Sequence, residues 1–215
     1  MRNKKKRFGI SLRVELIEKY NEKRDTLSQE WTNFLQKRAI IPILIPNTLD
    51  DVKSYISDLG IDGLILSGGD NIGEFPERDK TEKQILDYAI DKRFPVLGVC
   101  RGMQIINEYF AGKVFANDNN SHVGKPHQIH IMDQKFSKLL GDDNMQVNSF
   151  HNNIITKKGI GEKLQVFALS DHDNTIEGYY HSDLPIIGVM WHPERGMVSK
   201  HQTKLLEIFE NKSLW

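Results

Sequence analysis

The chain has 215 residues, enough for one α/β domain with a substantial buried core. Lysine plus arginine and aspartate plus glutamate number 29 each, and this balance argues against nucleic-acid or anionic-membrane binding. A single cysteine excludes an internal disulfide framework and a cysteine zinc site, and it fits a reducing cytoplasm. No apolar run approaches the roughly 18 residues of a membrane span. We therefore expect a cytoplasmic protein that binds neither nucleic acid nor membrane.

Strands and helices alternate through the first half of the chain. Apolar runs predict strands at 8–12, 40–45, 63–66 and 94–99, and helical spacing predicts helices at 27–37, 49–58, 79–92 and 102–110. Pro42 suggests that the second strand lies at an edge or an end. This order predicts an α/β fold with a doubly wound, mostly parallel sheet and helices on both faces, whose ligands bind beyond the carboxyl ends of the strands.

The second half is less regular. It predicts short strands at 128–132, 145–148, 164–169, 175–180 and 186–190 and a last helix at 200–211. Residues 116–126 are expected to form a loop, and residues 74–80 a solvated loop at a pocket rim. Since no repeat, low-complexity tract or Gly/Ser linker interrupts the chain, we expect one domain over residues 1–215.

The only cysteine, Cys100, stands between Gly98 and Gly102 where a predicted buried strand meets a predicted helix. Such a sharp turn strains the cysteine dihedrals, and the glycines leave room for neighbouring backbone, as in a nucleophile elbow. The helix N-terminus favours negative charge and so lowers the thiol pKa. A lone cysteine is more often a small buried apolar residue. In this setting the pattern favours Cys100 as a nucleophile.

A nucleophilic thiol needs a base, and the base needs an orienting group. His192-Pro-Glu194 follows an apolar strand, and in an extended chain His192 and Glu194 project to one side. Pro193 keeps His192 out of the helical region. Alone, such a pair is ordinary on a protein surface. Together with the elbow it predicts a catalytic triad of Cys100, His192 and Glu194.

Acyl transfer also needs backbone N–H groups that bind an oxyanion. The elbow offers the N–H of Arg101, and the Leu66-Ser-Gly-Gly-Asp70 turn at a neighbouring strand end offers that of Gly69. The alternative is that this second segment is a plain strand-ending turn.

Three motifs, taken together, carry a family resemblance: Leu66-Ser-Gly-Gly69, Gly98-Val-Cys-Arg-Gly-Met-Gln104 and His192-Pro-Glu194. The chain resembles the class I glutamine amidotransferase superfamily, and its elbow is most similar to that of the γ-glutamyl hydrolase branch, peptidase family C26. The resemblance implies a flavodoxin-like core, a single hydrolase domain and a γ-glutamyl thioester on Cys100. It makes His192 the base, Glu194 the orienting group, and Gly69 and Arg101 the oxyanion donors.

The resemblance also implies residues that bind the glutamyl group. Gln104 matches the position that contacts the glutamyl α-groups. Residues 147–151 are similar to the segment that closes over the same end, so Asn148, Ser149 and His151 are candidates. In the alternative, His151 is an ordinary loop residue.

The segment from Arg24 to Trp31 resembles a small subgroup, the γ-glutamyl-CDP-amidate hydrolases of capsule phosphoramidate synthesis. Cationic side chains suit a diphosphate, and Arg13 and Arg24 are the candidates. In the alternative, Arg24 and Asp25 merely begin the first helix, where Asp25 is a natural N-cap.

The expected activity is cleavage of the γ-glutamyl amide bond of a small-molecule conjugate, with release of glutamate. One alternative is a γ-glutamyl-GABA-type hydrolase of polyamine breakdown. Another is a glutaminase subunit that passes ammonia to a separate synthetase, and a third is a non-catalytic sensor. We expect no cofactor, and the sequence leaves a homo-oligomer open.

His122, His127 and His130 lie close together in the sequence, in or beside the predicted polar loop. No carboxylate-rich partner motif accompanies them, so we expect no metal. His172, His181 and His201 are expected at the surface.

Overall fold

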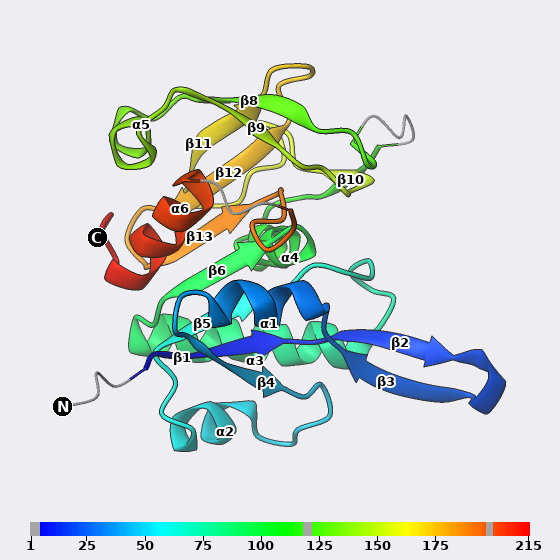
Figure 1. The fold of residues 1–215 in the computed structure, drawn as a ribbon. Coiled ribbons are helices and arrows are strands. Elements are labelled where there is room, and N and C mark those ends of the chain that lie inside the picture. The colour runs from blue at the N-terminus through cyan, green and yellow to red at the C-terminus, as the bar shows by residue number, and fades with distance from the viewer. Residues whose placement is uncertain (1–4, 118–121, 197–199) are drawn as a thin grey trace.

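The computed structural model describes residues 5–117, 122–196 and 200–215 (Figure 1). Its centre is a nine-stranded sheet in the order β4-β1-β5-β6-β13-β12-β11-β8-β9. The first five strands of that order run parallel: β4 Ile41–Ile45, β1 Arg7–Ser11, β5 Gly63–Leu66, β6 Val96–Val99 and β13 Ile186–Val189. The other four pair antiparallel: β12 Ile176–His181, β11 Leu164–Ser170, β8 His127–Ile131 and β9 Asn144–Val147. The prediction of a mostly parallel, doubly wound sheet is confirmed.

The parallel half has the flavodoxin-like strand order, because its strands come second, first, third, fourth and fifth along that half of the sheet. Every residue of β5, β6 and β13 is buried, as expected of strands covered on both faces. Pro42 lies in β4 at the sheet edge, where its missing N–H interrupts no ladder. The edge position predicted from Pro42 is confirmed.

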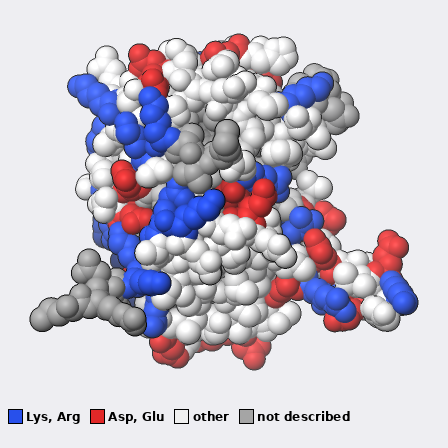
Figure 2. Space-filling view, in the orientation of Figure 1, with Lys and Arg blue, Asp and Glu red and all other residues white. Residues whose placement is uncertain are grey.

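Helices cover both faces of the sheet (Figure 1). One apolar cluster joins the sheet to α1 Gln29–Gln36, α5 Gln134–Leu140 and α6 Lys200–Asn211. A second cluster joins the other face to α2 Val52–Asp58, α3 Pro76–Lys92 and α4 Arg101–Tyr109. In the described part of the chain, no helix is long and apolar enough to cross a membrane. Lys/Arg and Asp/Glu side chains are interspersed over the face drawn in Figure 2, in keeping with the balanced composition.

A hairpin of β2 Arg13–Ile17 and β3 Glu22–Thr26, joined through the 3₁₀ turn Glu18–Tyr20, projects from the body of the molecule (Figure 1). The reading of Arg24 and Asp25 as a helix start is therefore wrong. Helix α1 begins later, and its N-cap is Ser28, whose Oγ accepts from the Glu30 N–H at 3.3 Å. Asp25 instead accepts from the backbone N–H of Asn47 at 2.9 Å, so its carboxylate joins the hairpin to the loop after β4.

The expected solvated loop at 74–80 is also wrong from residue 76 onward. Helix α3 begins at Pro76, whose fixed φ suits a first turn, and Arg78 within it is fully buried. Sequence periodicity missed this start because the first turn of the helix is charged. Helix α5 was not predicted either, although Asp133 caps it by accepting from the N–H groups of Lys135 and Phe136 at 2.8 and 3.1 Å.

The predicted loop at 116–126 includes residues 118–121, which lie outside the described residues. Beside it, β7 Phe115–Ala116 pairs with β10 Asn153–Ile154 in a separate two-stranded sheet.

Candidate active site

Cys100 lies between β6 and α4 with φ 53° and ψ −109°, the strained turn expected of an elbow. The flanking glycines are required by close backbone contacts. A Cβ on Gly102 would lie 1.9 Å from the Leu66 carbonyl oxygen, and one on Gly98 would lie 2.6 Å from the Gly102 carbonyl oxygen. Larger residues at these positions would push α4 away from the strands.

Sheet pairing brings the histidine segment to the elbow. Strands β6 and β13 are parallel neighbours, with Gly188 opposite Gly98 and Val189 opposite Val99, so their carboxyl ends lie together. Beyond β13, His192 Nδ1 lies 2.6 Å from Glu194 Oε1, and both side chains are buried. The carboxylate accepts from Nδ1, which leaves Nε2 for the thiol.

Asn148 holds the backbone of this histidine segment. Its Oδ1 accepts from the His192 N–H at 2.8 Å, and its Nδ2 donates to the His192 carbonyl at 2.8 Å and toward the Arg195 carbonyl at 3.3 Å. The amide is thus engaged by protein backbone. The structure gives Asn148 a positioning contact that the sequence did not suggest.

The electrostatics of the Cys100–His192 pair favour charge separation. Burial raises the pKa of the thiol, but the hydrogen bond with His192, the charges of His192 and His151 and the Arg101 backbone N–H together lower it below its usual value. Burial lowers the pKa of His192, but hydrogen bonds with Cys100 and Glu194 outweigh this and raise it to about 9. Both shifts favour the thiolate–imidazolium form of the pair.

The Ser67-Gly68-Gly69 turn lies directly against the pair. A Cβ on Gly68 would lie 2.7 Å from His192 Cε1 and 3.5 Å from Cys100 Cβ. Gly69 has φ +135°, and a Cβ there would lie 2.8 Å from Arg78 Nη1 and 2.9 Å from Arg13 Cβ. Glycine is thus needed at both positions: at Gly68 because a side chain would meet His192, and at Gly69 because its φ is positive.

A buried charge network, which the sequence analysis missed, supports this turn. Arg78 donates to the carbonyls of Ser67 and Gly68 at 2.7 and 3.1 Å and to Asp70 at 2.9 Å. Glu82 binds the same guanidinium at 3.1 Å and accepts from the Ser11 hydroxyl at 2.7 Å. The signal in the sequence was a pair of opposite charges spaced i, i+4, but only Glu82 lay in the predicted helix 79–92, and Arg78 lay in the predicted loop.

Arg101 joins the network from the elbow. Its guanidinium pairs with Asp79 and Glu82, so the residue that follows Cys100 is tied to α3. Burial lowers the pKa of Arg101, but Glu82, Asp79 and Asp70 outweigh this and raise it. The network holds the elbow and the glycine turn in one arrangement.

The other candidates for glutamyl binding have partners inside the protein. Gln104 is buried, with Nε2 3.4 Å from the Asn153 carbonyl. Ser149 donates its hydroxyl to the His122 carbonyl at 2.5 Å. His151 is also buried, with its Nδ1 2.9 Å from the Asn153 carbonyl, and its charge acts on Cys100.

A cavity open to solvent lies beside the histidine and the glycine turn. Its lining residues are Arg13, Thr26, Leu27, Ser28, Trp31, Ser67, Gly68, Gly69, His192, Glu194 and Arg195. Arg13 therefore lies where the sequence analysis expected a cation. Arg24 is not in this lining, because it lies on the exposed hairpin and pairs with Glu22 at 2.9 Å.

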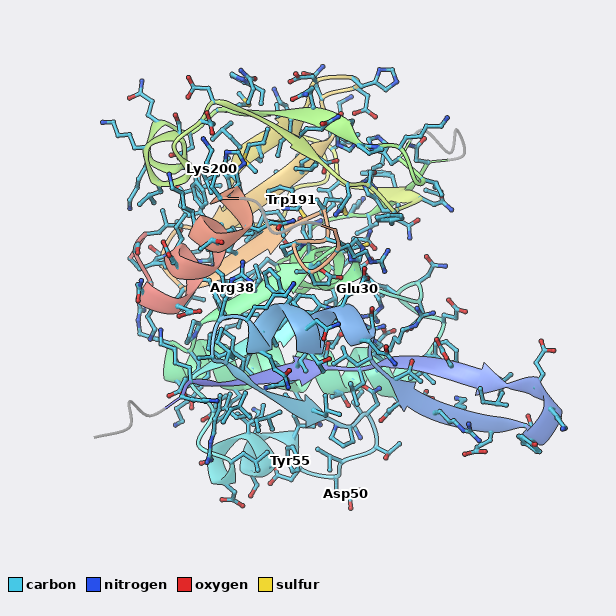
Figure 3. The ribbon with its side chains drawn as sticks, viewed as in Figure 1. Glu30, Arg38, Asp50, Tyr55, Trp191 and Lys200 are labelled. Carbon is cyan, nitrogen blue, oxygen red and sulfur yellow. The ribbon has the colours of Figure 1, made fainter. Side chains whose placement is uncertain are left out.

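Arg195 is a second cation of this cavity that the sequence analysis missed. Its guanidinium carbon lies 4.6 Å from the centre of the Phe150 ring, and its Nε lies 3.4 Å from Glu30 Oε2. Glu30, near the start of α1, and Trp191, just after β13, are labelled in Figure 3. The sequence signal for this cation was the position of Arg195, immediately after the His-Pro-Glu motif.

The remaining histidines fall into different environments. His122, His127 and His151 surround the buried carboxylate of Glu177, whereas His130 contacts Asn144 Oδ1 at 3.0 Å. The expected surface position of His181 is wrong: the ring is buried, and its Nδ1 accepts from the Asp183 and Leu184 N–H groups, both at 3.0 Å. His172 is exposed, and the partly buried His201 contacts Asp142 at 2.5 Å.

The fold and the elbow define a glutamine amidotransferase-like hydrolase, and comparisons with known proteins establish the family. The family model for peptidase C26 matches residues 9–194, and the chain belongs to this family. The γ-glutamyl-CDP-amidate hydrolase of Campylobacter jejuni is 34% identical over 197 residues, which cover 87% of this chain and 90% of that protein. One of the subunits of the glutamine-hydrolysing GMP synthase of Haloarcula marismortui is 28% identical over 180 residues, which cover 82% of this chain and 85% of that subunit.

Solved structures show the same fold. A glutamine amidotransferase from Thermotoga maritima superposes with a TM-score of 0.68 at 16% identity, covering 98% of this chain and 84% of that one. A glutamine amidotransferase from Methylobacillus flagellatus superposes with a TM-score of 0.65 at 19% identity, covering 89% of this chain and 71% of that one.

Proposed function

We propose that the protein hydrolyses a γ-glutamyl amide through the triad of Cys100, His192 and Glu194. The observation that carries this proposal is the geometry of the site: a strained elbow cysteine and a buried histidine lie against the same glycine turn, and the histidine Nδ1 lies 2.6 Å from a carboxylate. Membership of the peptidase C26 family supports the reaction class.

In the first half of the reaction, the Cys100 thiolate attacks the γ-carbonyl carbon. The backbone N–H groups of Gly69 and Arg101 stabilise the oxyanion. Within the described part of the chain, no acceptor takes the Gly69 N–H, so it is available for this role. The His192 imidazolium donates its proton to the departing nitrogen, the C–N bond breaks, and a γ-glutamyl thioester forms on Cys100.

In the second half, neutral His192 accepts a proton from water while the water oxygen attacks the thioester carbon. The C–S bond breaks, glutamate leaves, and the proton on His192 restores the ion pair with the thiolate. Glu194 keeps its contact with Nδ1 throughout and so holds the ring in one tautomer.

For the leaving group we propose a nucleotide amidate, as in γ-glutamyl-CDP-amidate, an intermediate of capsule phosphoramidate synthesis. Arg13 and Arg195 line the cavity beside His192, and guanidinium groups suit a diphosphate. The 34% identity to a hydrolase of this substrate supports the same assignment. A small-molecule conjugate processed in the cytoplasm fits the balanced charge and the single free cysteine.

A substrate panel tests the proposal. Purified protein is incubated with γ-glutamyl-CDP-amidate, γ-glutamyl-GABA and glutamine, and glutamate release is measured. We expect release from the nucleotide amidate, none from Cys100→Ala, and an unchanged circular dichroism spectrum for that variant. Activity retained by Cys100→Ala would contradict the mechanism.

The panel also separates the alternatives. Preference for γ-glutamyl-GABA would replace the nucleotide leaving group but keep the hydrolase. Release from glutamine alone would favour a glutaminase that supplies ammonia to a separate synthetase, in line with the similarity to part of a GMP synthase.

A further inference from the structure

Three histidines surround one buried carboxylate in the antiparallel half of the sheet. Glu177 lies on β12 and is fully buried. Its Oε1 lies 3.4 Å from His127 Nε2, 3.6 Å from His151 Nε2 and 4.0 Å from His122 Nδ1. The proposed reaction assigns no step to Glu177, His122 or His127.

The outer nitrogens of two of these rings are already fixed. His122 Nε2 lies 2.8 Å from Asp173 Oδ2, and His151 Nδ1 lies 2.9 Å from the Asn153 carbonyl. Carboxylate and carbonyl oxygens only accept hydrogen bonds, so each of these outer nitrogens carries a hydrogen. A metal ion binds neutral imidazole, and in the neutral rings the lone pairs of His122 Nδ1 and His151 Nε2 face Glu177.

The inner atoms of the cluster have no hydrogen-bond partner among the described residues. These atoms are both carboxylate oxygens of Glu177, Nδ1 of His122 and Nε2 of His151, and all are buried. Buried polar atoms that lack a hydrogen-bond partner are costly, and a group of them in one place points to a missing ligand. A cation between them would satisfy all of these atoms together.

We propose that His122, His151 and Glu177 bind a divalent transition-metal ion, with Zn²⁺ as the preferred ion. Their ligand atoms lie within 4.8 Å of one another, close enough for small side-chain movements to complete the site. Imidazole nitrogens with one carboxylate suit zinc, whereas Mg²⁺ and Ca²⁺ take oxygen ligands. Outer contacts from a carboxylate and a backbone carbonyl are typical of metal-bound histidines.

His127 is the candidate fourth ligand. Both of its ring nitrogens are buried without a hydrogen-bond partner among the described residues. Its side chain is 13% exposed, so it lies on the solvent side of the cluster and marks the entry path. This proposal does not depend on the hydrolase reaction, because its test measures binding.

Zinc binding is measured on chelator-treated protein by competition with a chromophoric chelator, and thermal unfolding is followed with and without Zn²⁺. We expect one Zn²⁺ per chain and a melting temperature that rises with Zn²⁺. Glu177→Gln and His122→Ala should lose this binding. Asp173→Asn, which replaces the outer carboxylate with a neutral amide and keeps every proposed ligand, should weaken it by about 10- to 100-fold.

Two controls locate the ion. His130→Gln removes a histidine from the same strand as His127 but outside the cluster, and it should bind Zn²⁺ like the wild type. Cys100→Ala should also retain binding, because the thiol is not a proposed ligand. In Co²⁺-loaded protein we expect ligand-field bands without a thiolate-to-cobalt charge-transfer band.

The proposal is overturned if the wild-type protein binds no Zn²⁺ at one equivalent. It is equally overturned if Cys100→Ala abolishes binding while Glu177→Gln and Asp173→Asn leave it unchanged. If His122→Ala fails to fold, Asp173→Asn still decides, because it keeps every proposed ligand.

Discussion

At the scale of single residues, Cys100 and Gly69 are the positions where local backbone and chemistry are most tightly linked. Both have positive φ, 53° and 135°, at the carboxyl ends of adjacent parallel strands. The strain at Cys100 is maintained by backbone contacts that only glycine at 98 and 102 permits. Substitutions at Cys100 or Gly69 should therefore alter the reactivity of the site more than they alter the stability of the fold.

Alkylation of the thiol tests the ion pair with His192. Cys100 is the only cysteine, so iodoacetamide labelling reports on it alone. The lowered thiol pKa predicts rapid labelling at pH values well below the usual thiol pKa of 9.0. In His192→Gln the hydrogen bond and the charge are lost, so the midpoint of the rate–pH profile should move upward. Equal midpoints in the two proteins would contradict the pair.

Gly69→Ala tests the glycine turn. The new Cβ would lie 2.8 Å from Arg78 Nη1 and 2.9 Å from Arg13 Cβ, so the turn and its N–H must shift. Misplacing one oxyanion donor should lower kcat for glutamate release by about 10²–10³-fold. The matched control is Gly73→Ala, which also has positive φ but meets nothing within 4 Å and should keep near-wild-type kcat. A similar loss in both variants would rule out a specific role for Gly69.

At the scale of elements, helix α3 joins the glycine turn to the elbow through its buried charges. Arg78 and Glu82 lie one turn apart on the helix, and they reach Ser67 on one side and Arg101 on the other. Burial raises the pKa of Glu82, but the two guanidinium groups outweigh this and lower it, so the carboxylate is ionised at neutral pH. The first turns of α3 are thus part of the site's scaffold.

Arg78→Met should destabilise the protein strongly. It leaves Asp70, Asp79 and Glu82 facing a single guanidinium, and an unpaired buried charge costs about 3–5 kcal/mol. The control is Lys23→Ala, which breaks an exposed ion pair with Glu77, the residue before Arg78. It should cost roughly 1 kcal/mol or less of unfolding free energy. Urea unfolding of both variants measures the difference, and equal losses would contradict the role of the network.

At the scale of the whole molecule, the sheet has two halves with different chemistry. The parallel half carries the elbow, the glycine turn and the histidine at its strand ends, whereas Glu177 and its histidines belong to the antiparallel half and its loops. Burial raises the pKa of Glu177, but His127 and His151 outweigh it and lower that pKa to about 2. The cluster therefore links folding stability to pH.

The sign of this linkage gives an acid-stability prediction. A carboxyl whose pKa falls from 4.5 in the unfolded chain to about 2 in the folded protein stabilises the fold above pH 4.5. That contribution is lost as the pH falls from 4.5 toward 2. Metal-free Glu177→Gln should show a shallower loss of unfolding free energy across this window than the wild type. Parallel curves would contradict the ionised state of the buried carboxylate.

The sequence by itself determined the parallel strands, most helices and the motifs at the elbow and histidine turn. These features depend on local patterns: β5, β6 and β13 are continuous apolar runs, and Gly98 and Gly102 are required by the turn in which they lie. The hairpin was missed because β3 is exposed and almost wholly charged, so the short apolar alternation of Val14 and Leu16 in β2 had no apolar partner strand to match it.

Only the tertiary structure decided which distant charges meet. Arg78 reaches Ser67 and Asp70, and Glu177 meets His122, His127 and His151, because the sheet order places remote segments side by side. A buried charge resembles a surface charge in the sequence, since burial is a property of what packs around it. Sequence thus determined the local turn at Cys100, and the fold determined the electrostatic surroundings that lower the pKa of its thiol.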